Sequence, residues 1–132
     1  MPHQIIEVSP NLPEVLDLKS LVQALHECAA EQEALPLGGL RTRVHIAAEH
    51  LIADQSPAFG FIAVYLRIAE GRTDAIKKQI GAALFQCLCH FVDSALGEAP
   101  VALSYEIQEI NPNFRWNRNK IADFMVGQQE SS

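Results

Sequence analysis

The chain has 132 residues, of which 48% are hydrophobic, and a formal net charge of −6. This length is sufficient for one domain with a single hydrophobic core. The acidic balance argues against nucleic acid as a partner, because phosphate binding requires a basic surface. No apolar run reaches the roughly 18 residues of a membrane span, and no basic and apolar leader is present at the start. We therefore expect no membrane partner.

The cysteines indicate a reducing compartment. There are three, Cys28, Cys87 and Cys89, and the last two are separated by one residue instead of the two of a zinc or redox motif. We interpret all three as buried or half-buried thiols in a cytoplasmic protein, with no metal bound.

The first third of the chain predicts a strand followed by a helix. Residues 3–9 have a strand pattern, and a turn region with two prolines follows them. Asp17 is the expected N-cap of a helix over residues 18–33, where apolar side chains recur at helical spacing. The sequence Leu-Pro-Leu-Gly-Gly over residues 35–39 ends this helix.

The second predicted strand carries charged side chains on one face. Residues 40–46 alternate in polarity, which places Arg41, Arg43 and His45 on the same side. A row of this kind is also typical of a solvated strand face. For His45, a structural role explains the residue better than a role as a second base.

The second half of the chain repeats this order. Residues 59–68 are almost continuously apolar, which is typical of a strand covered on both faces. Thr73 is the expected N-cap of a long helix that Gly97 ends. Residues 101–110 predict the fourth strand, and residues 121–126 a short last element.

This order predicts an α+β fold with two β-α-β units, about residues 2–47 and 59–110, duplicated within one domain over residues 1–126. Residues 127–132 are expected to be a disordered tail. Each crossover helix requires parallel strands within its unit, and two helices can cover only one face of a four-stranded mixed sheet. Because the third strand is apolar on both sides, we expect the open face to pack on other subunits in a closed homo-oligomer.

The Met1-Pro2 sequence suggests a chemical role for the N-terminus. The small side chain of proline permits methionine removal, which would leave Pro2 as a free secondary amine on a rigid strand. Burial in an apolar pocket would lower the pKa of that amine toward neutrality, where a base for proton abstraction works best. If Met1 is retained, the Pro2 nitrogen is an amide without a basic lone pair, and a non-enzymatic oligomeric binding module becomes the alternative.

Several motifs resemble the 5-carboxymethyl-2-hydroxymuconate isomerase family of the tautomerase superfamily. They are Met1-Pro2-His3, the stretch from Leu37 to His45, Gly71-Arg72-Thr73, and the stretch from Leu103 to Ile107. The resemblance covers the chain from Pro2 to about Phe124. It implies a homotrimer of tautomerase-like chains that use no cofactor or metal. It also implies small anionic substrates, unsaturated di- or tricarboxylates from aromatic catabolism.

The resemblance also implies roles for individual residues. Pro2 matches the proline that shuttles the proton, and Arg72 matches the arginine of a Gly-Arg-Ser/Thr motif. Arg41 lies on the strand where related tautomerases place a second substrate-binding arginine, and Arg43 is a further candidate. Phe114 and Trp116 could form an apolar wall of the pocket beside Pro2 of a neighbouring subunit, although packing explains them as well.

Together these residues predict an isomerase that moves a proton within an unsaturated 2-hydroxy or 2-oxo carboxylic acid. The planar guanidinium of arginine binds a carboxylate through two donors and stays charged. Nearby cations would keep the proline amine neutral. A dehalogenase or hydratase of unsaturated acids remains an alternative, because the same groups can activate water. Glu106 either orients an arginine or is a plain surface carboxylate.

Overall fold

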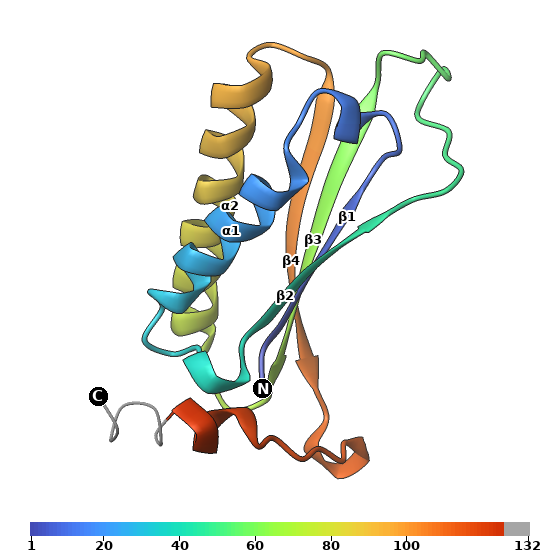
Figure 1. Ribbon diagram of the computed structural model, residues 1–132. Helices are drawn as coiled ribbons and strands as arrows, with labels where there is room; N and C mark the ends of the chain where they lie inside the picture. The colour runs from blue at the N-terminus through green and yellow to red at the C-terminus, as the bar shows by residue number, and fades with distance from the viewer. Residues whose placement is uncertain (126–132) are drawn as a thin grey trace.

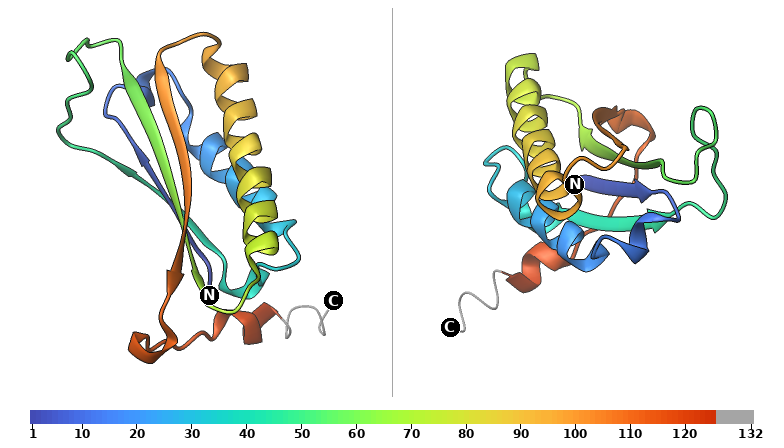
Figure 2. Two further views of the ribbon diagram at one scale, coloured as in Figure 1. Left: turned by 180° about the vertical axis from the view of Figure 1, so that it is seen from behind. Right: turned by 90° about the horizontal axis from the view of Figure 1, so that it is seen from above.

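The computed structural model describes residues 1–125, so the predicted tail and residue 126 lie outside the described part. Figure 1 shows a four-stranded sheet with two long helices across one of its faces. The strands are β1 (His3–Val8), β2 (Arg41–Ile46), β3 (Gly60–Ala69) and β4 (Val101–Ile110), and the long helices are α1 (Leu18–Ala30) and α2 (Asp74–Leu96). The view from above in Figure 2 confirms the predicted arrangement of both helices on one side of the sheet.

The sheet has the strand order β2-β1-β3-β4. Within each unit the strands are parallel, with His3 opposite Arg41 in the first unit and Gly60 opposite Val101 in the second. The two units meet through the antiparallel pair β1 and β3, where His3 lies opposite Arg67. As a result, the starts of β1 and β2 lie at the same end of the sheet as the ends of β3 and β4.

Both helices begin at the predicted caps. The Asp17 carboxylate accepts a hydrogen bond from the N–H two residues further on, and the Thr73 hydroxyl accepts one from the N–H three residues further on, each at 3.2 Å. α2 ends at Gly97, whose φ of 58° suits a residue without a side chain. α1 ends at Ala30, earlier than the predicted residue 33, because the backbone closes a hydrogen-bonded turn at residues 29–32.

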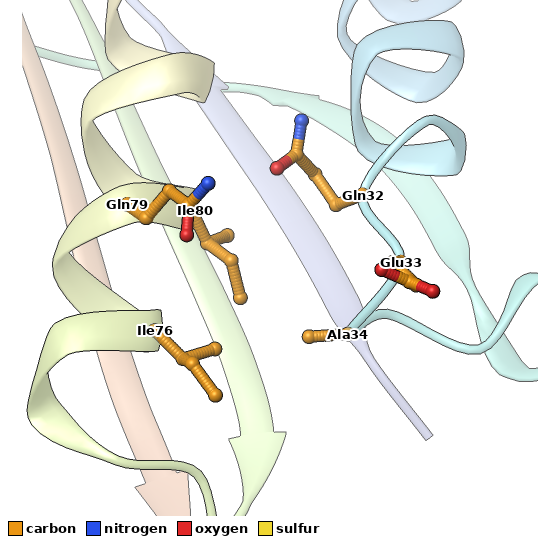
Figure 3. A pocket seen from close by; sticks show the side chains of 6 residues that line it. All are labelled: Gln32, Glu33, Ala34, Ile76, Gln79 and Ile80. Carbon is orange, nitrogen blue, oxygen red and sulfur yellow. The ribbon is translucent and has the colours of Figure 1, made fainter.

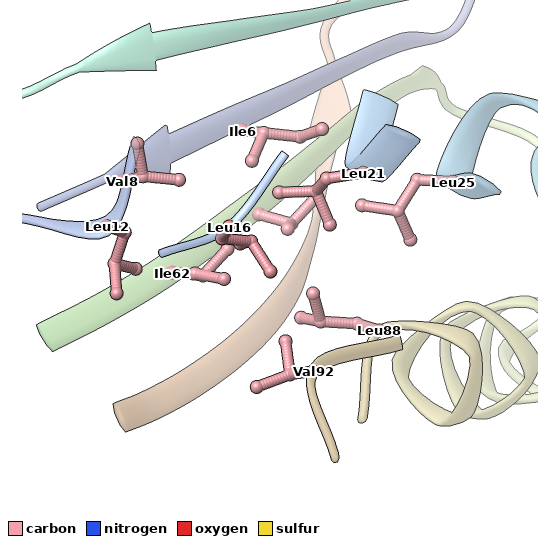
Figure 4. Close-up of a cluster of buried hydrophobic side chains, with 10 residues drawn as sticks. Ile6, Val8, Leu12, Leu16, Leu21, Leu25, Ile62, Leu88 and Val92 are labelled. Atoms are coloured by element: carbon pink, nitrogen blue, oxygen red, sulfur yellow. The ribbon is translucent and has the colours of Figure 1, made fainter. Parts of the chain in front are cut away.

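The core lies between the helices and the sheet (Figure 4). Alternate residues of the two central strands face the helices, and among them Ile6 and Ile62 are fully buried. Leu25 of α1 and Leu88 of α2 are buried against them. Burying a side chain of this size contributes about 1.5–3 kcal/mol. Since a slip of one residue would turn this apolar set outward, the core fixes the strand register and with it the position of the N-terminus.

The opposite face of the sheet is apolar at its centre, as expected from the third strand. Ile5 of β1 and Phe61, Ala63 and Tyr65 of β3 are only partly buried within the single chain. Exposed apolar area of this kind is typical of a face that contacts another subunit.

The three cysteines are half-buried and free of disulfides, in agreement with the prediction. Burial raises the pKa of Cys28 to about 11, which keeps its thiol protonated at neutral pH. Among the helices of residues 1–125, none is long and apolar enough to cross a membrane.

Candidate active site

Four segments that are distant in sequence meet at one end of the sheet. They are the N-terminus, the start of β2, the turn after β3, and the segment of residues 112–125 that follows β4. Figures 1 and 2 show the N-terminus beside this last segment in two views from opposite sides. The strand pairing is responsible, because it brings the starts of β1 and β2 together with the ends of β3 and β4.

Pro2 is fixed at the beginning of the inner strand β1. Its side chain is fully buried, and its carbonyl oxygen accepts a hydrogen bond from the Arg41 N–H at 3.1 Å. Gly39 packs directly against Met1 and Pro2. A Cβ at Gly39 would lie 3.1 Å from the Met1 Cα and 3.3 Å from the Pro2 Cδ. Glycine at this position therefore permits the close approach of the N-terminus to β2.

The terminal amine lies among arginines. In this chain it belongs to Met1, which is half-buried. Burial lowers the pKa of the amine, and the positive charges of Arg115, Arg72 and Arg41 lower it further, in that order. The same two causes would act on a proline amine one residue along the chain.

Arg41 and Arg43 lie on either side of the His3 ring. The Arg41 Nη1 is 3.3 Å from the His3 Nε2, and the Arg43 Nη1 is 3.3 Å from the His3 Nδ1. Burial and then the charges of Arg41 and Arg43 lower the pKa of His3 to about 4, so its ring is neutral at pH 7. A neutral imidazole has one acceptor nitrogen, and arginine can only donate. Only one of the two contacts can therefore be a hydrogen bond at a given moment.

Arg72 is held mainly by backbone carbonyl oxygens. Its Nε and Nη2 donate to the Ala34 oxygen at 3.0 and 2.7 Å, and its Nη1 donates to the Ala69 oxygen at 3.1 Å. These bonds join the segment after α1 to the end of β3, which is a structural role. Two of the five N–H groups of a guanidinium remain for a ligand after three such bonds.

Arg115 and Asn117 are also at this site, although neither is among the residues predicted from the sequence. The Arg115 Nη2 donates to the Met1 carbonyl oxygen at 3.1 Å. The Met1 sulfur is contacted by the Asn117 Nδ2 at 2.6 Å and by the Arg41 Nη2 at 3.4 Å. Met1 thus occupies a space that is lined by two arginines and an amide.

The segment that carries Arg115 is anchored to the body of the protein. The Asn119 Nδ2 donates to the Gly38 carbonyl oxygen at 2.8 Å. A Cβ placed on Gly38 would lie 2.9 Å from the Ala122 Cβ, so the helical turn over residues 121–125 packs closely on this glycine. At the start of the segment, the Asn111 side chain caps a short helical turn.

The aromatic residues of this segment are not part of the site within the single chain. Phe114 is 76% exposed and Trp116 is 86% exposed, while Arg115 between them is partly buried. His45 is also exposed. The Glu106 carboxylate accepts a hydrogen bond from the Gln108 side chain, its neighbour on β4. The wall that Phe114 and Trp116 were predicted to form therefore requires a neighbouring subunit.

Within residues 1–125, the arginines of this cluster form no ion pair with an acidic side chain. In the described residues 1–125, the ion pairs are those of Lys77 with Asp74 and Glu109, and none involves Arg41, Arg43, Arg72 or Arg115. Guanidinium groups gathered at one end of an acidic protein, without ion pairs in the described part of the chain, have the chemistry to bind an anion. Donors fixed in this way can also stabilise negative charge that develops during a reaction.

In the described part of the chain, cavities are also found that are lined by residues other than these arginines. One, of about 260 Å³, lies between the first turns of α2 and the segment that follows α1 (Figure 3). Ile76 and Ile80 line one side of it, and Gln32 and Ala34 line the other. A second cavity is lined by residues of α1 and β2, and a third by residues of α2 and β4. Within residues 1–125, no group of three or more His, Cys, Asp or Glu side chains is arranged to hold a metal ion.

Comparison with known proteins gives the same family from sequence and from structure. The family model described as 5-carboxymethyl-2-hydroxymuconate isomerase matches residues 2–125. A 5-carboxymethyl-2-hydroxymuconate Delta-isomerase from Escherichia coli is 31% identical over 121 residues, which are 92% of this chain and 96% of the relative.

Solved structures agree with this result. A 5-carboxymethyl-2-hydroxymuconate isomerase from Deinococcus radiodurans R1 superimposes with a TM-score of 0.84 and 32% identity, over 94% of this chain and 93% of the other. A fused 4-OT described as a symmetric trimer shares the fold alone, with a TM-score of 0.60 and 16% identity over 84% and 88% of the chains.

The fold and these matches define the class of the protein as a tautomerase-like isomerase. More narrowly, the chain belongs to the 5-carboxymethyl-2-hydroxymuconate isomerase family.

Proposed function

We propose that the chain isomerises an unsaturated 2-hydroxy or 2-oxo carboxylic acid such as 5-carboxymethyl-2-hydroxymuconate, with Pro2 as the base once Met1 has been removed. The single observation that carries this proposal is that the terminal amine, which is that of Met1 in this chain, lies among Arg41, Arg72 and Arg115, where burial and charge lower its pKa. The same surroundings would act on the Pro2 amine after removal of Met1. An amine with a lowered pKa is neutral in a larger fraction of molecules at pH 7, and only the neutral form can accept a proton.

In the proposed reaction, the Pro2 nitrogen takes the proton of the 2-hydroxyl group and returns it to a carbon further along the conjugated chain. The bond that breaks is O–H, the bond that forms is C–H, and the double bonds shift by one position or by two. The amine ends the cycle neutral, so no cofactor or metal is needed. Negative charge gathers on the 2-oxygen and its carboxylate during transfer. Arg41, with its fixed donors, stabilises this charge.

The contacts of Met1 support this position for the substrate. Its carbonyl oxygen is bound by Arg115, and its sulfur lies against Arg41 and Asn117. These two atoms stand in for the polar groups of a substrate. Removing Met1 would free the amine and open the same space for an acid with polar groups at both ends.

We propose that the active protein is a homotrimer. The apolar residues on the open face of the sheet and the exposed Phe114 and Trp116 support this, since both are surfaces that a neighbouring subunit would bury. In such a trimer, the two aromatic rings would form a pocket wall beside Pro2 of the adjacent subunit. We place the protein in the cytoplasm, where cysteines free of disulfides are usual.

The test compares two forms of the protein that differ only in Met1. Mass spectrometry identifies each form, and the ultraviolet change of a 2-hydroxymuconate-type acid reports turnover. We expect the form that begins at Pro2 to be active and the form that retains Met1 to be at least about 10²-fold slower, because general base catalysis contributes 10²–10⁴-fold. Pro2→Ala in the processed protein should lose a similar factor, apart from a residual rate from the alanine amine.

The alternatives give different results in the same experiment. Equal turnover by both forms would exclude the proline amine as the base. Release of halide or addition of water to the acid would identify a dehalogenase or a hydratase. Binding of the acid without any turnover by the processed form would favour a binding module.

A further inference from the structure

We propose that Arg115 is a further catalytic residue, which binds the substrate oxygen that lies next to the Pro2 nitrogen. This inference rests on the proposed function and assigns a specific contact within it. Phe114 and Trp116 were the candidates predicted in this segment, but both are exposed. Arg115, which lies between them, contacts the N-terminus of its own chain.

The first argument is the position of the Arg115 donor. Its Nη2 is 3.1 Å from the Met1 carbonyl oxygen. That oxygen and the Pro2 nitrogen are bonded to the same carbon, so they are about 2.2 Å apart from standard bond lengths. Arg115 therefore already holds an oxygen immediately beside the future base. In the processed chain this donor would face the 2-oxygen or the adjoining carboxylate of a bound acid.

The second argument is that Arg115 and Arg41 mark two separate points. Arg115 binds the backbone oxygen of Met1, whereas Arg41 and Asn117 contact the sulfur, further along the side chain. A substrate with a 2-oxo acid group at one end and a second carboxylate at the other can reach both. Arg115 would bind the 2-oxygen beside the base, and Arg41 with Asn117 would bind a carboxylate that shares the developing negative charge through the conjugated double bonds.

The third argument is that the Arg115 guanidinium is positioned before a substrate binds. Its segment is held to the second short helix, η2 (Leu37–Gly39), by the bond from Asn119 to the Gly38 oxygen. Arg115 is partly buried while the residues on both sides are exposed, and none of the acidic side chains of residues 1–125 forms an ion pair with it. A donor that is positioned before the substrate arrives needs little rearrangement during the reaction.

Arg115 would also act on the base itself. Among the charges that lower the pKa of the Met1 amine, that of Arg115 has the largest effect, ahead of Arg72 and Arg41, and the Pro2 amine would lie one residue along the same chain. Replacing it with a neutral residue should therefore raise the pKa of the amine. This effect is a second readout, and a purely structural role would not produce it.

The experiment uses the processed protein with Arg115→Gln and, as a matched control, Arg118→Gln, which removes an exposed arginine three residues further along the same segment. Two quantities are measured. One is kcat/KM for a 2-hydroxymuconate-type acid on its pH plateau, and the other is the pKa of the Pro2 amine by NMR titration of proline-labelled protein. The melting temperature of each variant verifies folding.

We expect Arg115→Gln to lower kcat/KM about 10²-fold, mostly in kcat, because removing one oxyanion donor has an effect of this size. We also expect it to raise the amine pKa, while Arg118→Gln changes neither quantity. Arg115→Lys should restore the pKa but only part of the rate, since lysine lacks the planar pair of donors.

Two outcomes would overturn the proposal. One is a kcat/KM for Arg115→Gln within threefold of the parent, and the other is a loss of activity with an unchanged amine pKa. Failure of the proposed function would be seen elsewhere, as parent activity that survives Pro2→Ala. In that case the amine titration would still report whether Arg115 acts on the N-terminus.

Discussion

The two ends of the sheet have the same architecture and opposite chemistry. At one end, the starts of β1 and β2 and the segments after β3 and β4 bring together Pro2, Arg41, Arg72 and Arg115. At the other end, the connection after β1 meets the start of β3 through hydrogen bonds between neutral groups. There the Ser9 hydroxyl accepts a hydrogen bond from the Phe61 N–H at 3.0 Å.

This difference indicates that the fold alone would not determine which end carries the proposed active site. Two β-α-β units joined through an antiparallel pair have similar ends, because each end combines two strand starts with two strand finishes. Side chains decide between them. Arg72 follows β3, whereas Ser9 and Pro10 follow β1. The terminal amine lies at the end of the sheet that also carries Arg72. Under the proposed function, a few residues would thus determine which end of the sheet is active, on a fold that could carry the activity at either end.

The largest effect is expected from Arg41→Gln at the basic end. The variant removes a guanidinium that contacts both His3 and the space filled by Met1. We expect kcat/KM of the processed protein to fall about 10²–10³-fold, since a fixed donor to developing charge is lost. Steady-state kinetics measures this loss. A melting temperature that stays near that of the parent would show that the effect is catalytic, and unchanged kinetics would remove Arg41 from the site.

At the other end of the sheet, we expect a substitution to lower stability and to leave activity unchanged. Ser9 is fully buried, and Ser9→Ala removes the acceptor of the Phe61 N–H. A buried donor left without a partner costs about 1–3 kcal/mol. We therefore expect urea denaturation to show a loss of this size in the free energy of unfolding, with kcat/KM of the folded protein unchanged. A loss of activity without a loss of stability would contradict the division of roles between the two ends.

The smallest effect is expected in the pH dependence of stability. The folded-state pKa of His3 is about 4, below its ordinary value of 6.5, because burial and two arginines disfavour the charged ring. Between these values the unfolded chain binds the proton and the folded chain does not. The stability that neutral His3 supports is therefore fully present above pH 6.5 and is lost as the pH falls toward 4.

His3→Gln tests this sign directly. The variant should show a shallower decline of the urea midpoint between pH 6.5 and 4.5 than the parent, because it has no imidazole to protonate. Carboxylates contribute mainly below this range. An equally steep decline in both proteins would mean that His3 is not the group responsible.

Much of the fold could be predicted from local sequence signals. Asp17 and Thr73 as helix caps, Gly97 as a helix end, and the apolar run of the third strand each correspond to a feature of the structure. These signals act over a few residues, so a single sequence contains them. The end of α1 was predicted three residues too late, because hydrophobic spacing continues through a turn that only the backbone hydrogen bonds reveal.

The site was less predictable, because its residues are joined by tertiary packing. Arg115 and the terminal residue that it contacts are 114 positions apart, and no pattern of local spacing connects them. A basic residue between two aromatic side chains was the one available signal. Arg72 illustrates a second limit. The motif indicates a ligand contact, whereas the structure shows that most of its donors are occupied by the Ala34 and Ala69 carbonyls.

The close packing of Met1 has a consequence for how the protein matures. In the folded chain its sulfur and carbonyl oxygen are engaged by three side chains, and its backbone lies against Gly39. An aminopeptidase needs a free, extended terminus, which is present on the nascent chain while it leaves the ribosome. If Met1 is removed, as the proposed function requires, its removal would therefore compete with folding. Under the proposed function, fast synthesis in a foreign host would leave a fraction of molecules that retain Met1 and are inactive. A fusion placed ahead of Met1 would make all molecules inactive.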